Sequence, residues 1–244
     1  MKITHISGAD DIAAQSDGTL WVSEPAAGMV THISSAGEVL ARVVDPETPE
    51  GVVALDDGRL LVAEQTSDRI VVLHPPSPER ATLIQLTPRP GVDGVDGLGF
   101  DPENRLVLVP DSAQGRLLSI AVDGGRPSVV ASDLGRAVGA AVSPEGDIAV
   151  AVEAASGLVL VNRNSGAATA VTGISQADDV VAAGPLLYVS SLEAHEILAV
   201  DPGSRRFQVL VTDVDMPQGL ASLPGDRLAV IDSTTGSVAL VPAC

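Results

Sequence analysis

Residues 51–64 read GVVALDDGRLLVAE, and this stretch decides the fold. It joins a short apolar run to a longer one through Asp57-Gly58, a pair that accepts the positive φ angles of a tight hairpin turn. The longer run ends on a carboxylate, Glu64. Residues 11–24, DIAAQSDGTLWVSE, repeat the same order of apolar run, turn, apolar run and carboxylate. The pattern predicts a pair of antiparallel strands that recurs along the chain.

The pattern occurs six times in the chain. The copies begin at Asp11, Gly51, Gly97, Gly139, Asp179 and Gly219, at spacings of 40, 46, 42, 40 and 40 residues. A repeat of this length with four short strands is typical of a β-propeller blade, which buries its faces only against its neighbours. We therefore predict an all-β, six-bladed β-propeller with blades of four antiparallel strands, one domain over residues 1–244. The sixth copy has room for only three strands, and we expect residues 2–6 to complete it and close the ring.

Charge restricts the classes of partner. The chain carries 32 Asp and Glu against 14 Lys and Arg, a net charge of −18. Such a field repels phosphate backbones and anionic lipid surfaces, so neither nucleic acid nor a membrane is expected as a partner. The charge favours a cation or a cationic or neutral small molecule, although an acidic surface that only maintains solubility has the same composition.

Few features of the sequence bear on location and assembly. No apolar run reaches the roughly 18 residues of a transmembrane helix. Residues 1–7 lack the apolar segment of a signal peptide, and the one cysteine, Cys244, forms no disulfide within the chain. We expect a cytoplasmic protein, and a monomer, because a closed ring leaves no free strand edge.

Several phrases resemble a known family. Residues 96–102 with 109–112, and residues 217–221 with 231–233, resemble the blade motif of the senescence-marker-protein/gluconolactonase (regucalcin-like) family. The chain is also similar to NHL-repeat and strictosidine-synthase-like propellers, and Glu64 with residues 68–70 resembles the NHL pattern. The resemblance covers the whole chain and indicates a fold more than a reaction.

Two sets of positions are expected to converge on one mouth of the channel, because the first strand of a blade begins where the second ends. The residues just before the first strands are Asp10, Glu50, Asp96, Val138, Asp178 and Gln218. Those at the ends of the second strands are Glu24, Glu64, Asp111, Glu153, Ser191 and Asp232, with Glu153 fitting after a one-residue slip. Two carboxylates roughly 6 Å apart repel by about 3 kcal/mol at an effective dielectric near 20. We therefore predict a compensating Ca²⁺ or Mg²⁺ ion; the alternative is that the second set accepts backbone hydrogen bonds or pairs with arginines such as Arg69 and Arg116.

The gluconolactonase resemblance assigns roles within the first set. It implies that Asp10 and Asp96 are metal ligands and that Asp178 is both ligand and general base. The sequence departs from the family at Val138, where the family carries an asparagine ligand, so Glu50 or Gln218 must complete the shell if the site is intact. A metal there would polarise a lactone or ester carbonyl while Asp178 accepts a proton. The second-set carboxylates and His195, in the loop after the second strand of blade five, are the candidate substrate-binding residues.

Other signals are weak. The chain has no G-x-S-x-G, P-loop, H-E-x-x-H or paired-cysteine motif. We interpret residues 93–97, DGVDG, as a turn and His5, His32 and His74 as structural. Trp21 and Tyr188 occupy matching strand positions and are expected in the core. Because the chain has only one Trp, one Tyr and two Phe, a large stacking pocket is not expected, and any ligand is expected to be small or aliphatic.

Three functions compete at this stage. The first is a metal-dependent hydrolase or lactonase acting on a small molecule. The second is a non-catalytic, NHL-like propeller that binds a small molecule or a protein. The third is a lyase or cyclase, which a deep apolar channel beneath the acidic rim would favour; a streptogramin-lyase-like site would also need a histidine before a first strand, and none is there.

Overall fold

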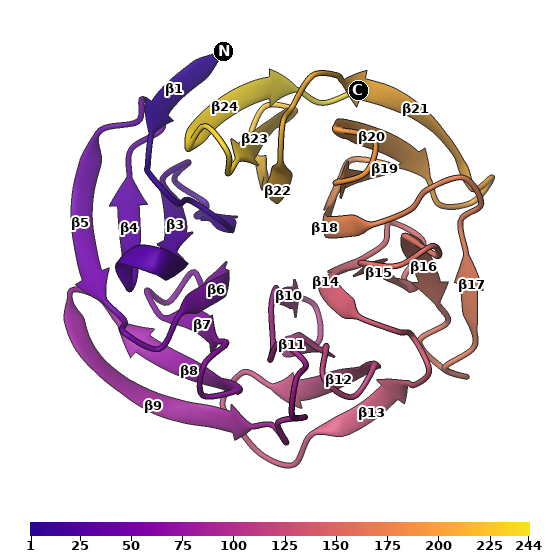
Figure 1. Ribbon diagram of the computed structural model, residues 1–244, viewed down its shortest axis with the longest axis horizontal. Coiled ribbons are helices and arrows are strands. Elements are labelled where there is room, and N and C mark those ends of the chain that lie inside the picture. Colours follow the sequence, from indigo (N-terminus) through magenta and orange to yellow (C-terminus); the bar gives the residue numbers. More distant parts are fainter.

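The computed structural model describes residues 1–244 and confirms the predicted architecture. Six sheets of four antiparallel strands form a ring, and β1 lies beside β24 where the two ends of the chain meet (Figure 1). The first strands of the six blades line a central channel. The first three blades comprise β2 (Ile12–Ala14), β3 (Leu20–Glu24), β4 (Met29–Ile33) and β5 (Val39–Val44); β6 (Pro49–Ala54), β7 (Leu60–Glu64), β8 (Arg69–His74) and β9 (Ser77–Gln85); β10 (Gly99–Asp101), β11 (Leu106–Asp111), β12 (Arg116–Ala121) and β13 (Ser128–Ala131).

The second half of the ring repeats this arrangement. It comprises β14 (Ala137–Val142), β15 (Ile148–Val152), β16 (Leu158–Val161) and β17 (Ala168–Ala170); β18 (Ala177–Ala183), β19 (Leu186–Ser191), β20 (Glu196–Asp201) and β21 (Arg206–Val211); β22 (Pro217–Leu223), β23 (Arg227–Asp232), β24 (Ser237–Pro242) and β1 (Lys2–His5). The N-terminal strand thus supplies the outer strand of blade six, as the strand count of the sixth copy predicted. The one helix is a single 3-10 turn, η1 (Pro25–Ala27), and no helix of the structure is long and apolar enough to cross a membrane.

The core lies between the blades. Each blade packs its apolar face on the next, and the largest cluster joins strands of blades two and three through residues such as Leu61, Ile70 and Val109. Trp21 is 5% exposed and Tyr188 is fully buried, which confirms that both are core residues. Trp21 also stacks on His32 with ring centroids 4.4 Å apart, so this histidine is structural.

Close packing at the centre explains the glycines that open most repeats. A Cβ atom at Gly51 would lie 2.6 Å from the carbonyl oxygen of Asp96, and one at Gly97 would lie 2.4 Å from that of Val138. Real side chains do not approach backbone atoms so closely. The inner strands therefore meet at a narrow level of the channel, just inside the residues predicted to form the site.

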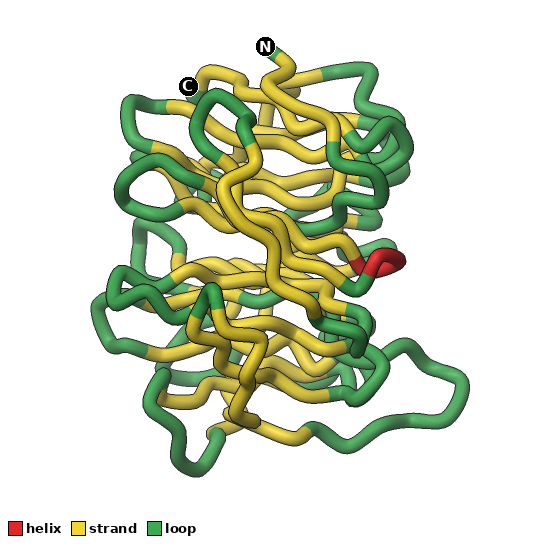
Figure 2. The backbone as a smooth tube through the Cα atoms, turned by 90° about the vertical axis from the view of Figure 1, so that its left-hand side faces the viewer, coloured by secondary structure: helices red, strands yellow, loops and turns green.

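The two faces of the ring differ. η1 follows the end of β3, and the backbone N–H of Asp10 donates to the Ser23 carbonyl, so the start of β2 lies on the face that carries η1 (Figure 2). We call this the mouth face. The tight turns between first and second strands, such as the one at Asp57-Gly58, lie on the opposite face.

Candidate functional site

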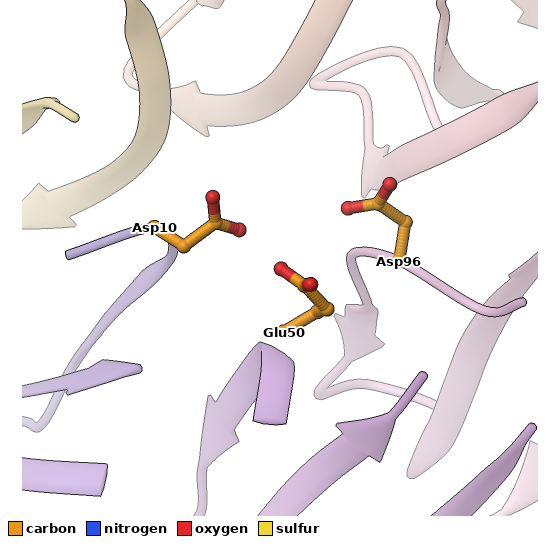
Figure 3. Close-up of side chains that lie close together, drawn as sticks. All are labelled: Asp10, Glu50 and Asp96. Carbon is orange, nitrogen blue, oxygen red and sulfur yellow. The ribbon is translucent and has the colours of Figure 1, made fainter. Parts of the chain in front are cut away.

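Three of the predicted ligands meet at the mouth of the channel. Asp10 precedes β2, Glu50 lies in a β-bulge at the start of β6, and Asp96 ends the loop before β10. One carboxylate oxygen from each lies within 4.8 Å of the others, and the three side chains point into one space (Figure 3). They come from three successive blades, so the ring rather than any local motif brings them together. We call these three residues the carboxylate triad.

The remaining first-set residues differ in what they present. Asp178 lies in the β18 bulge and is half-buried. Its carboxyl group is repelled by the charges of Asp96 and Asp10. Burial raises the pKa of Asp10, and hydrogen bonding by Glu50 and by Gln218, from the blade on its other side, opposes this rise. Val138 is 1% exposed and belongs to a buried hydrophobic cluster, so blade four offers no ligand at this position.

Blade four contributes a cation instead. The guanidinium of Arg136, just before β14, lies 2.8 Å from an Asp96 carboxylate oxygen and also pairs with Glu153. Its Nη2 is 4.0 Å from Asp93 as well. Arg136 was not among the predicted site residues, and its position two residues before Val138 is the one signal in the sequence that points to it. One arginine shared in this way leaves most of the negative charge at the mouth uncompensated.

Burial and mutual repulsion raise the pKa values of the mouth carboxyls. Burial, a hydrogen bond with Asp10 and the charges of its neighbours raise the pKa of Glu50 to about 11. Burial and the charge of Asp10 raise the pKa of Asp96 to about 7, against the opposing effect of Arg136. Burial, then the charges of Asp96 and Asp10, hold the pKa of Asp178 well above its usual range. Without a bound metal ion, the carboxyl groups at the mouth therefore retain protons at neutral pH, and Glu50 is protonated.

Of the second-strand carboxylates, Glu153 is linked to the triad, through the Arg136 guanidinium that also bonds Asp96, whereas the others bond elsewhere. Glu64 and Asp111 are fully buried and pair with Arg69 and Arg116 at the start of the adjacent strand, as the structural alternative proposed. The others are likewise bonded within or beside their own blade: Glu24 accepts from Thr31, Glu153 pairs with Arg136, and Asp232 accepts from Thr235 at 2.9 Å. This geometry favours structural roles for all of the set except Glu153, and substrate binding by these residues stays a prediction.

A buried acidic pair extends from Glu64 into blade one. Arg80 Nη1 lies 2.8 Å from Asp45 and 3.3 Å from Glu64, and both carboxylates are fully buried. Burial and the charge of Glu64 raise the pKa of Asp45 to about 6. Arg80 therefore holds two blades together by compensating two carboxylates at their interface.

His195 lies on the mouth face but outside the triad. It is exposed in the turn after β19, with Nδ1 2.6 Å from the Asp215 carbonyl oxygen. No histidine lines the channel. Residues 93–97 form an irregular segment fixed by a bond from the Val95 N–H to Asp68 Oδ1 at 2.9 Å, which agrees with the turn interpretation.

A second pair of acids closes the narrow level just inside the mouth. Asp11 and Asp179 stand where the other four repeats carry glycine. Asp11 accepts the Ile12 N–H at 2.7 Å and the Val52 N–H of blade two at 2.8 Å. Asp179 makes the same two bonds with its own strand and with blade six, at 2.7 and 2.8 Å. We call Asp11 and Asp179 the inner acid pair, and each joins two blades.

The inner acid pair has its own signal in the sequence, an aspartate paired with a serine. In both blades the amide of the aspartate donates to a serine hydroxyl on the second strand, Ser23 at 2.9 Å and Ser190 at 2.8 Å. Aspartate at the repeat start and serine before the last residue of the second strand occur together in blades one and five only.

Comparison with known proteins supports the fold alone. No protein-family model matches the sequence, and no curated protein matches it. Among solved structures, the PQQ-bound aldose sugar dehydrogenase of Streptomyces coelicolor superimposes with a TM-score of 0.79 at 14% identity, covering 98% of this chain and 95% of that one. A catalytically inactive histidine-to-alanine variant of virginiamycin B lyase from Staphylococcus aureus, with quinupristin, gives 0.73 at 13% identity, covering 97% and 80%. A chain of the nidogen/laminin complex gives 0.77 at 15% identity, covering 91% and 88%. The chain is thus a six-bladed β-propeller, and its neighbours include both enzymes and a chain from a protein complex.

Proposed function

We propose that the protein is a divalent-metal-dependent hydrolase that opens a lactone or small ester at the mouth face. The observation that carries the proposal is the carboxylate triad, whose oxygens lie within 4.8 Å of one another. Ca²⁺–oxygen distances of about 2.4 Å place ligand oxygens up to about 5 Å apart around one ion. Hard carboxylate oxygens also suit Ca²⁺ or Mg²⁺, so the donor set fits the ion that the gluconolactonase resemblance implies.

The charge state of the site supports the same conclusion. Glu50, 9% exposed, retains a proton only because burial and neighbouring carboxylates oppose its ionisation. A divalent cation would replace that proton and stabilise all three carboxylates. Gln218, which acts on Asp10, and Asp178, which is repelled by Asp96 and Asp10, would complete the shell, because valine at position 138 replaces the asparagine that the resemblance implies.

The chain's own residues would perform the remaining steps. A cation held by the triad would supply a Lewis acid for the carbonyl of a lactone or ester. Positive charge at the triad would also lower the raised pKa of Asp178, so that this carboxylate can accept a proton from an attacking water. Arg136, bonded to Asp96, can orient an anionic or carbonyl oxygen of the substrate beside the site.

One observation favours a lyase or cyclase as the second candidate. The channel on the far side of Asp11 and Asp179 is apolar, which favours that hypothesis, and virginiamycin B lyase is among the structural neighbours. Against it, the lyase in that comparison is inactive without one histidine, and no histidine lies at the triad or in the channel of this chain. A purely binding propeller is the third candidate, and it needs no metal.

A panel of lactones and small esters, tested beside quinupristin, the compound in the virginiamycin B lyase structure, distinguishes the three. Incubation with Ca²⁺, Mg²⁺ or Mn²⁺ and mass spectrometry of the products shows either gain of one water, for hydrolysis, or ring opening without a change in mass, for elimination. Asp178→Asn should lower a hydrolytic rate by about 100-fold or more, whereas Asp226→Asn, an exposed residue on the opposite face, should not. Absence of turnover with every metal and substrate would leave the binding propeller as the better account.

A further inference from the structure

The central channel continues beyond the inner acid pair as a separate cavity of about 580 Å³. Its wall is made by the inner strands of the six blades, and one end is formed by Asp11 and Asp179. The other end includes residues 100–103, at the turn between β10 and β11. Because these turns lie on the face opposite the mouth, the cavity opens there. None of the triad residues lines it, and neither does Asp178, so it is distinct from the proposed metal site.

The wall of the cavity is aliphatic and made of small side chains. Each inner strand contributes a run such as 12–14, 52–54, 140–142 or 180–182, built from Ile, Val and Ala. Phe100 is the one aromatic residue of the lining. A volume of this size is within the range of small-molecule sites, and such walls contact a saturated carbon chain better than a flat ring.

The polar end of the cavity is formed by two carboxyl groups that no positively charged side chain of the lining compensates. The two oxygens of Asp11 and of Asp179 accept backbone N–H bonds, which fix both carboxyl groups in place. Burial and the charge of Asp179 nevertheless raise the pKa of Asp11 well above its usual range, and burial raises the pKa of Asp179 to about 6, so a bound cation would stabilise the ionised form of both. No lysine, arginine or histidine lines the cavity, and Glu103 adds a further carboxylate at the open end. An anion or an uncharged alcohol gains nothing from this field, whereas a cation does.

We propose that this cavity is a binding site for a small aliphatic ammonium compound. The ammonium group lies at the inner acid pair, where carboxylate lone pairs not used by the backbone accept its N–H bonds, and the alkyl chain lies along the aliphatic wall toward the open face. The proposal does not depend on the hydrolase, because the cavity and the triad lie on opposite sides of the narrow level.

The test is calorimetric titration of the whole protein with n-alkylammonium chlorides from ethyl to hexyl, in EDTA so that the metal site plays no part. We expect one site, with affinity rising about fourfold per added methylene until the cavity is filled. At equal chain length, n-pentanol and pentanoate should bind at least about tenfold more weakly than n-pentylammonium. Equal binding of pentanol would overturn the assignment of a cationic ligand, and absence of ammonium binding would overturn the site.

A pair of variants places the ligand in the cavity. Ala54 and Ala182 are half-buried on the inner strands of blades two and five and line the cavity. The double variant Ala54→Leu/Ala182→Leu narrows it and should weaken pentylammonium binding by about tenfold or more, while Ala81→Leu, the same change on an exposed outer strand, should leave it unchanged. Unchanged binding in a folded double variant would refute binding in the cavity. If the double variant fails to fold, the comparison of pentylammonium with pentanol on the unaltered protein still decides the proposal.

Discussion

Glu50→Gln should stabilise the metal-free protein while it destroys the proposed metal site. Glutamine has the shape of the protonated carboxyl, and the pKa of about 11 means that Glu50 is protonated in the folded protein at pH 7. In the unfolded chain the same carboxyl is ionised above its ordinary value of 4.5. Folding must therefore take up a proton at pH 7, and this lowers stability increasingly as pH rises above 4.5. The glutamine variant has no such penalty.

The size of the effect follows from the pH interval. Between the ordinary pKa and pH 7 the penalty grows to about 3 kcal/mol, an upper value because neighbouring carboxyls can share the proton. We expect Glu50→Gln to raise the free energy of unfolding by 1 to 3 kcal/mol, on the order of that penalty, at pH 7 in EDTA, and to have almost no effect near pH 4. Urea unfolding at both pH values measures this directly.

A matched control and a clear refutation are available. Glu38→Gln changes an exposed glutamate in a turn and should alter the stability little at either pH. In Ca²⁺ the unaltered protein should be more stable than the Glu50→Gln variant, because only the unaltered protein gains stability from the bound ion. If Glu50→Gln destabilises the metal-free protein, or if its effect is the same at both pH values, Glu50 is ionised in the folded state and the reasoning is wrong.

Three further predictions concern the ring itself. Asp179→Ala removes two backbone hydrogen bonds, one to the next blade, and should cost about 2 kcal/mol in urea unfolding; a loss below 0.5 kcal/mol, less than about one ordinary hydrogen bond, would show that these bonds do not join the blades. Gly97→Ala places a Cβ 2.4 Å from a carbonyl oxygen of blade four and should lower stability by about 1 to 3 kcal/mol, as overpacking does, whereas a neutral result would mean that the inner strands are not closely packed. Arg80→Gln leaves two fully buried carboxylates without their shared cation and should destabilise by about 2 kcal/mol, more at pH 8 than at pH 4, where protonation relieves the repulsion. If Arg80→Gln lowered the stability equally at pH 4 and pH 8, repulsion between Asp45 and Glu64 would not be the cause of the loss.

The fold could be predicted from sequence because its signals are local. Each Asp-Gly or Glu-Gly turn and the alternation of apolar runs specify a hairpin, and six copies at similar spacing specify a closed ring. The strand left over at residues 2–6 even predicted how the ring closes, which the pairing of β1 with β24 confirms. None of these signals needs knowledge of distant contacts.

The site could be predicted only in part because its geometry depends on which way each side chain turns. Residues just before a first strand do reach the mouth, as Asp10, Glu50 and Asp96 show. Residues such as Glu64 and Asp111 turn instead toward arginines on the adjacent strand of their own blade. Spacing alone gives the face of the ring on which a residue lies, and not the direction of its side chain.

The missed residues are those whose partners lie in other blades. Arg136 bonds to Asp96, 40 positions away, and Asp11 bonds to the amide of Val52, 41 positions away. Such contacts become visible only when neighbouring repeats are aligned side by side. The sequence shows that blade four has an uncharged residue, Val138, at the ligand position. It does not show that Arg136 of the same blade reaches Asp96.

The most direct test of the central claim is calorimetric titration of the metal-free protein with Ca²⁺, Mg²⁺ and Mn²⁺ at pH 7 in two buffers of different ionisation enthalpy. The account predicts one equivalent of a divalent ion, release of at least one proton from the mouth on binding, and loss of binding in Glu50→Gln and Asp96→Asn but not in Glu38→Gln. No binding, or binding that both triad variants leave unchanged, would show that the carboxylate triad is not a metal site.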